Sequence, residues 1–556
     1  MNKKVCSFPI LFALLALLIG TCAVVFPASA QAAPTSTGSI TVSGTVASSY
    51  NAYQIFSANV VDGDSDAKIA TDLAWVNDAA RDAALPVLHS AGMPNSQTTA
   101  QEAAEWLNAD SHLTSALSAQ LARSLQSSGA VFVALNAGTA AELHCGYWLI
   151  VADDDAIAQG EAGTAPIMAL VGGSAVTVKP KAATPKVSKH VLEDGTAAWQ
   201  KAADATVADD LYWRLSATVP AGLTAYDTYT VRFVDTMSAG LDPSKVAASM
   251  RVYVAAGADG GFDAVRAGKD GRAGTEPAKG WADITAQCAT KVAADGKTFT
   301  VRTGDLIAAL GGADAFTAGA RVVAVYNAPL NGACNHGIAK GNPNEVYLRY
   351  PRSPFADQSG DAGFTRTPSD DATAYTWDLA LTKRGSDGDK PLAGAVLSIA
   401  DDRGRTLAAD GTWDAEGKAT VTTGEDGRVT VSGVDSGKLE VRELKAPKGY
   451  NAFEGTRSVT VKAEGLDVDQ VAAAKPKLTI TAESPLRADS ADGSTGSLEA
   501  SLINTPTGTP PSITTGGFMP STGDMAMYAA AAAAVAGAAL IVVALLVKRG
   551  GGSHKE

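Results

Sequence analysis

Short runs in which hydrophobic and polar residues alternate recur along most of the chain. Examples are GSITVSGTV near the start, YTVRFVD in the middle and GRVTVSGV towards the end. A period of two places every second side chain on the same face of a strand, so that one face is apolar and the other polar. The 55 Gly and 24 Pro residues punctuate these runs with turns. The pattern predicts an all-β multidomain fold built from tandem β-sandwiches.

One stretch departs from this period. Between Thr99 and about Ser127, Trp and Leu residues recur at helical intervals. Thr99 and Glu102 have the spacing of a capping box, which marks a helix N-terminus. We expect a break in this stretch near Ser111. The first domain is therefore predicted to be a β domain with a helical insert.

The two ends of the chain differ from everything between them. Residues 1–30 have two early lysines, an apolar core and a small-residue end, the plan of a secretory signal peptide. Residues 525–547 are uncharged and as a helix would span roughly 35 Å, enough to cross a bilayer. The tail 548–556 is basic, which marks the cytoplasmic side. These features predict a secreted protein with a C-terminal transmembrane helix.

Changes in pattern divide the rest of the chain. The Gly- and Asp-rich stretch 357–374 is predicted to separate the second folded unit from the third, and a Pro-, Thr- and Gly-rich stretch is suited to crossing a cell wall as an extended linker. The predicted units are an N-terminal domain (31–180), a middle domain (185–364), a third domain (375–506), the wall-spanning linker (507–518) and a short polar motif (519–523).

Composition argues against several classes of function. The net charge of -13 and the pI near 5.0 argue against nucleic acid as a partner. The sequence has no Gly-rich phosphate loop, no Ser/His/Asp set and no pair of catalytic carboxylates, so we expect neither an enzyme nor a cofactor. A metal site is not expected either, because the six histidines are scattered and no CxxC or HExxH spacing occurs.

Three cysteines remain after removal of the predicted signal peptide. An oxidising exterior favours pairing of two of them. Cys288 and Cys334 lie in the same predicted domain, so the expected disulfide joins these two. Cys145 is then expected to be free and buried near Trp148.

The residues around the C-terminal apolar segment resemble a known signal. Met519, Pro520, Ser521, Thr522 and Gly523, followed by an apolar helix and a basic tail, resemble the LPxTG cell-wall sorting signal of Gram-positive surface proteins. Met519 replaces the usual leading Leu. The resemblance implies that a membrane sortase cuts between Thr522 and Gly523 through a cysteine thioester and passes the acyl group to an amine. It also implies anchoring to peptidoglycan in the cell wall.

The third unit resembles the Cna-B type immunoglobulin-like domains of Gram-positive pilins and adhesins. The stretches that carry the resemblance are WDLALTKRGSDGDKPLAGAVLSI, GKLEVRELKAPKGYN and GSLEASLINTPTG. The resemblance implies an internal isopeptide bond in which Lys383 attacks the side chain of Asn504 and ammonia leaves, with Glu443 as the supporting acid. Burial favours the uncharged forms of a lysine and of a carboxylic acid, as this reaction requires.

The middle unit resembles the middle domain of sortase-assembled pilin shafts, of the Cna-A type. Its stretches PKVSKHVLEDG, YTVRFVDTMSAGL and GNPNEVYLRY carry the resemblance. A bond from Lys189 to either Asn344 or Asn342, supported by Asp235, is implied. Asn331 is a weaker alternative, and the following YPRSP departs from the asparagine-rich ending of the family.

The junction before the middle unit resembles the VxVYPK motif of shaft pilins. VTVKPK aligns with it and makes Lys181 the implied amine that attacks the sortase-bound Thr522 of another copy. The match is partial, because Lys179 replaces Tyr and Gly172 stands where Trp is frequent. Lys179 and Lys186 therefore remain alternatives.

Together these resemblances imply a major shaft subunit of a covalent pilus. Its implied partners are pilin-class and housekeeping sortases, identical subunits and peptidoglycan. Linkage from head to tail does not close on itself and so builds a filament. The alternative is a wall-anchored monomeric adhesin or minor pilin that binds a ligand on a host or neighbouring cell.

Overall fold

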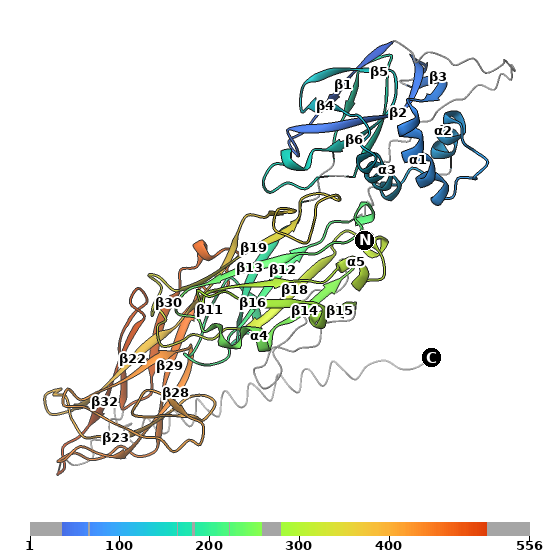
Figure 1. Ribbon diagram of the computed structural model, residues 1–556. Coiled ribbons are helices and arrows are strands. Elements are labelled where there is room, and N and C mark those ends of the chain that lie inside the picture. Colours follow the sequence, from blue (N-terminus) through green and yellow to red (C-terminus); the bar gives the residue numbers. More distant parts are fainter. Residues whose placement is uncertain are drawn as a thin grey trace, which may run out of the picture.

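The described chain has three β-rich regions arranged in a row (Figure 1). The computed structural model describes residues 36–64, 67–109, 111–163, 165–180, 184–221, 223–257 and 280–508. We call 36–180 the N-terminal region, 184–375 the middle region and 377–508 the C-terminal region. The sheets in each region confirm the predicted all-β, multidomain architecture.

The N-terminal region combines two sheets with three helices. Its strands are β1 (Thr37–Val42), β2 (Ser49–Asp62), β3 (Lys68–Trp75), β4 (Val133–Asn136), β5 (Ala140–His144), β6 (Gly146–Ala152), β7 (Ile167–Val171) and β8 (Val176–Val178). They form one sheet in the order β5-β1-β8 and another in the order β3-β2-β6-β7, with β4 paired to β2. The helices α1 (Asp78–Ser90), α2 (Ala100–Asn108) and α3 (Ser115–Ser127) share an apolar core with the second sheet.

The predicted helical insert is confirmed. The capping box of Thr99 and Glu102 begins α2, and the chain leaves the helix after Asn108 and re-enters it at Ser115. Helix α1 was not predicted from the sequence.

The middle region is a sandwich of two sheets around one apolar core. One sheet has the order β10-β9-β12-β18-β14-β15, and the other has the order β11-β21-β19-β13-β17-β16 with β20 on β19. The strands are β9 (Val187–Glu193), β10 (Ala198–Gln200), β11 (Ala202–Asp204), β12 (Tyr212–Thr218), β13 (Arg232–Met237), β14 (Arg251–Ala255), β15 (Trp281–Asp283), β16 (Ala289–Val292), β17 (Thr298–Arg302), β18 (Arg321–Asn327), β19 (Asn342–Pro351), β20 (Phe364–Arg366) and β21 (Asp370–Tyr375). Two short helices, α4 (Val246–Ser249) and α5 (Leu306–Ala309), lie between strands.

The C-terminal region is a second sandwich. The sheet β27-β22-β32-β31 faces the sheet β25-β24-β23-β28-β29-β30, in which β26 pairs with β23. The strands are β22 (Trp377–Gly385), β23 (Val396–Ala400), β24 (Thr406–Leu407), β25 (Trp413–Asp414), β26 (Val421–Thr422), β27 (Arg428–Val434), β28 (Gly437–Lys445), β29 (Thr456–Glu464), β30 (Lys477–Ala482), β31 (Leu486–Asp492) and β32 (Ser497–Asn504). The first strand, β22, runs parallel to the last, β32.

The stretch 357–374 is not a separator. It contributes β20 and β21 to the middle sandwich, where β21 pairs with β19. The polar residues of β21 hide its strand character, but Ala372 and Ala374 point into the core and are fully buried. Only Thr376 then lies between β21 and β22.

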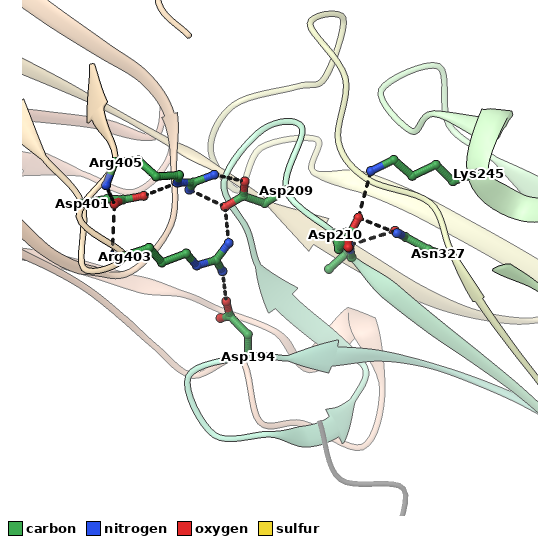
Figure 2. A network of polar contacts seen from close by, with 9 residues as sticks. Asp194, Asp209, Asp210, Lys245, Asn327, Asp401, Arg403 and Arg405 are labelled. Carbon is green, nitrogen blue, oxygen red and sulfur yellow. Dashed lines mark hydrogen bonds and ion pairs between the residues drawn. The ribbon is translucent and has the colours of Figure 1, made fainter. Parts of the chain in front are cut away.

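A polar network joins the middle and C-terminal regions (Figure 2). Arg405 forms a two-pronged ion pair with Asp209, at 2.6 and 2.7 Å, and also binds Asp401. Arg403 reaches Asp209 at 2.9 Å and Asp194 at 3.2 Å. Both arginines come from the loop between β23 and β24, whereas Asp194 and Asp209 belong to the middle region. The network therefore fixes the orientation of one sandwich on the other.

Several predicted features lie outside the described residues. These are the signal peptide (1–30), Lys181, the motif 519–523, the transmembrane segment 525–547 and the tail 548–556. Within the part of the chain that the structure describes, no helix has the length and apolar character needed to cross a membrane.

Candidate intramolecular cross-link sites

The C-terminal site arises where three inward-facing rows of side chains end in polar residues. On β22, Leu379 and Leu381 precede Lys383 on the same face, and the alternation continues without a break. The row on β32 ends in Asn504 in the same way, and the row on β28 ends in Glu443. The strand period therefore carries a lysine, an amide and an acid into the interior, where they are 0%, 2% and 7% exposed.

These three side chains contact one another. The Lys383 Nζ donates to Asn504 Oδ1 and lies 3.3 Å from Glu443 Oε1. Both carboxylate oxygens of Glu443 accept from Asn504 Nδ2, at 2.9 and 3.0 Å. Burial lowers the pKa of Lys383 to about 8, against the opposing effect of Glu443. An amine, an amide carbonyl and a carboxyl group beside the amide nitrogen are thus together.

The middle site is built by the same periodicity on two facing sheets. Lys189 lies on β9 in one sheet, and Asp235 on β13 and Asn344 on β19 lie in the other. Met237 pairs with Asn344 across these strands, so Asp235 and Asn344 are diagonal neighbours on one face. All three polar side chains are fully buried.

The tyrosine Tyr326 on β18 occupies the centre of the middle site, and the sequence analysis did not identify it. Its hydroxyl lies 2.9 Å from Lys189 Nζ, 2.8 Å from Asn344 Nδ2 and 3.0 Å from Asp235 Oδ2. Lys189 Nζ also donates directly to Asp235 Oδ2. The run RVVAVYN gave only a weak signal, because its residues do not alternate and all but Arg321 are buried; the two-residue spacing from Val322 and Ala324 places Tyr326 on the same face.

Burial dominates the electrostatics of the middle site. It lowers the pKa of Lys189 to about 8 although Asp235 favours the charged form. It raises the pKa of Asp235 although Lys189 and Tyr326 oppose the rise. Both shifts favour a neutral amine beside a protonated acid.

The alternative asparagines of the middle domain lie elsewhere. The side chain of Asn342 binds the backbone of Asn335 at both ends, at 2.8 and 2.9 Å, and also donates to Ala374 O. The side chain of Asn331 donates a hydrogen bond to Ala239 O and accepts one from the backbone N–H of Ala333. Of the three asparagines, Asn344 is the one that shares a hydrogen-bond partner, the Tyr326 hydroxyl, with Lys189.

The alternative linkage lysines lie on either side of the predicted position. Lys179 is exposed directly after β8. Lys186 is also exposed, and its backbone is fixed to Thr218 at the start of β9. The choice between these two and Lys181 stays a prediction.

The predicted disulfide between Cys288 and Cys334 is wrong, because the structure shows both thiols free. Cys288 directly precedes β16, level with the start of β13, whereas Cys334 lies against Gly240 beyond the end of β13. A six-residue strand such as β13 separates its ends by about 17 Å, and a disulfide needs Cα atoms within about 7 Å. Cys145 is free and buried, as expected.

Thiol labelling should verify this correction. The full-length chain, unfolded without reductant and alkylated, is expected to carry the label completely at both Cys288 and Cys334, because neither sulfur is bonded to another. Peptide mass spectrometry gives the labelled fraction at each position. A parallel sample reduced before alkylation serves as the control. Label that appears only after reduction would contradict the free-thiol assignment.

Comparison with known proteins identifies one part of the chain. Residues 378–475 match the family described as SpaA, prealbumin-like fold domain. Most of the C-terminal region is therefore similar to a SpaA-type domain. This SpaA-like domain contains Lys383 and Glu443, while Asn504 follows the matched residues.

The chain is also similar to the trypsin-resistant surface T6 protein of Streptococcus pyogenes serotype M6. The two are 30% identical over 143 residues, which is 24% of each chain. The match thus covers about a quarter of that relative's length.

Solved structures with some similarity in fold include a backbone pilin and a major pilin. The T6 backbone pilin of Streptococcus pyogenes serotype M6 is 16% identical with a TM-score of 0.46, covering 85% of this chain and 98% of that one. The major pilin SpaD of Corynebacterium diphtheriae is 15% identical with a TM-score of 0.40, covering 85% and 98%.

Proposed function

We propose that this chain is the major shaft subunit of a covalently polymerised surface pilus. The observation that carries the proposal is the convergence of Lys383, Glu443 and Asn504 in the interior of the C-terminal region. Lysine and glutamate are almost never fully buried unless they are paired, and here they also meet an amide that a lysine could attack. This arrangement supports an isopeptide bond between Lys383 and Asn504.

A second bond, between Lys189 and Asn344 with Asp235 in support, completes the proposal for the sandwiches. The β22 and β32 strands are the first and last of the C-terminal region and lie side by side. The bond between Lys383 on β22 and Asn504 on β32 would carry a pulling force on the two ends of the region through covalent links, so that the sheets would not have to unfold. Such a reinforced chain suits a fibre exposed to shear and proteases.

The subunits would be joined from Thr522 of one copy to Lys181 of the next by a pilin-class sortase. Before assembly, the signal peptide 1–30 would be removed, and 525–547 with the tail 548–556 would hold the chain in the membrane. The linker 507–518 would cross the wall, and a housekeeping sortase would attach the base to peptidoglycan. The division into domains is part of this proposal: the first domain is 31–180, the middle domain extends from 185 to Tyr375 because β21 belongs to it, and the third runs from Trp377 to 506. Similarity to the T6 surface protein supports a surface location.

Linkage is tested by boiling wall extracts in detergent and blotting for the chain. The parent strain is expected to give a ladder of high-mass bands, because amide bonds survive this treatment. Lys181→Ala and, separately, Thr522→Ala should each collapse the ladder to monomer. Lys179→Ala and Lys186→Ala are the matched controls and should keep it.

Each outcome separates the alternatives. A single band in the parent would overturn the shaft proposal and favour the wall-anchored adhesin or minor pilin. A ladder that persists in Lys181→Ala but disappears in Lys179→Ala or Lys186→Ala would reassign the amine and keep the polymer.

A further inference from the structure

The hydroxyl of Tyr326 touches all three groups of the middle site. It accepts hydrogen bonds from Lys189 Nζ and Asn344 Nδ2 and donates one to Asp235 Oδ2. A phenol has one hydrogen and two acceptor positions, so these three contacts use its full capacity. The hydroxyl therefore lies between the nitrogen that would lose a proton and the nitrogen that would leave.

The C-terminal site reaches the same chemistry without a tyrosine. There the two oxygens of Glu443 contact Asn504 Nδ2 directly, and one of them lies 3.3 Å from Lys383 Nζ. Aspartate is one methylene shorter than glutamate. In the middle site the described hydrogen bonds join Asp235 to Lys189 and Tyr326 but not to Asn344. The tyrosine hydroxyl occupies the position beside the leaving nitrogen that the glutamate occupies in the C-terminal site.

We propose that Tyr326 is a catalytic proton relay for the Lys189–Asn344 bond. This inference rests on the bond proposed above. The neutral Lys189 Nζ attacks Asn344 Cγ, so that an Nζ–Cγ bond forms and the Cγ–Nδ2 bond breaks. One proton must move from Nζ to Nδ2 before ammonia can leave. Tyr326 takes that proton on its oxygen and passes its own hydrogen to Nδ2, which leaves the tyrosine unchanged.

The remaining polar atoms of the site are consistent with proton transfer by Tyr326 and activation of the amide carbonyl by Asp235. Asn344 Oδ1 and Asp235 Oδ1 are buried and have no hydrogen-bond partner among the described residues. A proton on Asp235 would allow that carboxyl to polarise the Asn344 carbonyl and would free the tyrosine hydrogen to turn towards Nδ2. Burial raises the pKa of Tyr326 well above its usual value, so the side chain stays a neutral hydroxyl. It therefore transfers a proton by accepting one on its oxygen while it donates its own.

The scaffold holds the relay in place. The Tyr326 ring packs edge-on against Phe299, with centroids 4.8 Å apart, and Lys189 Nζ lies 5.4 Å from the ring centre. Replacement by phenylalanine keeps both ring contacts and removes only the oxygen. Tyr326→Phe is therefore the sharpest variant for this test.

The experiment follows both cross-links in one sample. The full-length chain is made by cell-free translation, sampled over time and digested, and mass spectrometry quantifies the peptides joined through Lys189 and Asn344. The peptides joined through Lys383 and Asn504 give a reference rate of linkage in the same sample. Tyr326→Phe is expected to slow the first linkage about 100-fold, the range for loss of one proton-transfer group, and to leave the second unchanged. In a Lys189→Met background, where no bond forms, the fall in melting temperature on Tyr326→Phe measures the lost hydrogen bonds to Asp235 and Asn344 separately from the rate of linkage.

The outcomes distinguish the relay from the bond. Equal rates of the first linkage in the parent and in Tyr326→Phe would overturn the relay and leave the bond standing. Slowing of both linkages together would also overturn it, because the loss would then lie in folding. Absence of the Lys189–Asn344 peptide from the parent would overturn the bond and the relay together.

Discussion

Lys383→Met is expected to lower the free energy of unfolding of the C-terminal region by about 5 kcal/mol. Without the cross-link, the unfolded chain regains the conformational entropy that a closed loop between Lys383 and Asn504 removes. Lys383 and Asn504 are 121 positions apart, so their bond would restrict most of the unfolded SpaA-like domain. Methionine fills a similar volume without a nucleophile, which limits the cavity contribution to the loss. The shortfall of the intact mass from the calculated mass should also shrink by about 17 Da, the mass of the ammonia that aminolysis no longer releases. Thermal melting and intact mass measure the two effects.

Lys390→Met is the matched control for this variant. Lys390 follows β22 in the same region, but its side chain is 57% exposed and makes only surface contacts, an ion pair with Asp387 and a contact over the Tyr450 ring. Surface pairs of this kind contribute about 0 to 1 kcal/mol, so the control should melt close to the parent and keep the parental mass deficit. A parent at the full calculated mass, or a Lys383→Met chain with the parental deficit, would refute the bond.

The strand period explains why so much of both sites was predictable. Alternation alone places Lys383 in line with Leu379 and Leu381, and a polar residue at an inward position is a strong indication of chemistry. The resemblance supplied the pairing of strands that are far apart in sequence. Tyr326 was missed because tyrosine is an ordinary core residue, and only the three-dimensional position of its hydroxyl distinguishes it.

Other features depended on contacts that the sequence pattern does not reveal. Helix α1 has an internal proline, Pro86, and an inner face made largely of alanines, so its amphipathic signal is weak. The strand β21 was read as a separator because it begins with Asp370 and Asp371 and follows a Gly- and Asp-rich stretch. Shared membership of a domain suggested the Cys288–Cys334 pairing, but the two cysteines lie towards opposite ends of β13.

A cluster of acids lies behind the ion pairs of the junction between the middle and C-terminal regions. Glu193 and Asp204 come from the middle region and are 7% and 2% exposed. Asp204 Oδ2 accepts from Trp377 Nε1 at 2.6 Å and from the Ser436 hydroxyl at 2.5 Å, which ties it to the C-terminal region. Burial and the charge of Asp204 raise the pKa of Glu193 to about 8, and burial raises that of Asp435. The junction therefore holds protons that the unfolded chain would release.

The stability of this junction is expected to fall as the pH rises from about 5 to 8. Glu193 in the unfolded chain titrates near 4.5, so within this window the folded form holds a proton that the unfolded form has lost. Stability decreases with pH wherever the native state binds more protons, and for one group with this shift the total loss is on the order of 5 kcal/mol. Thermal melting of the full-length chain across this range measures the slope.

Glu193→Gln should make the decrease of stability with pH less steep, because an amide does not ionise. The titration of Asp435 would still cause part of the decrease. The slopes are compared, and not the stabilities at one pH. Glutamine has one acceptor oxygen where Glu193 offers two, to the N–H groups of Gly195 and Asp204, so the variant loses some stability equally at every pH. Glu416→Gln, at a side chain 74% exposed, is the control and should keep the parental slope. An unchanged slope in Glu193→Gln would place the titration elsewhere. A flattened one would show that the packing of the SpaA-like domain on the middle sandwich depends on a proton held between them.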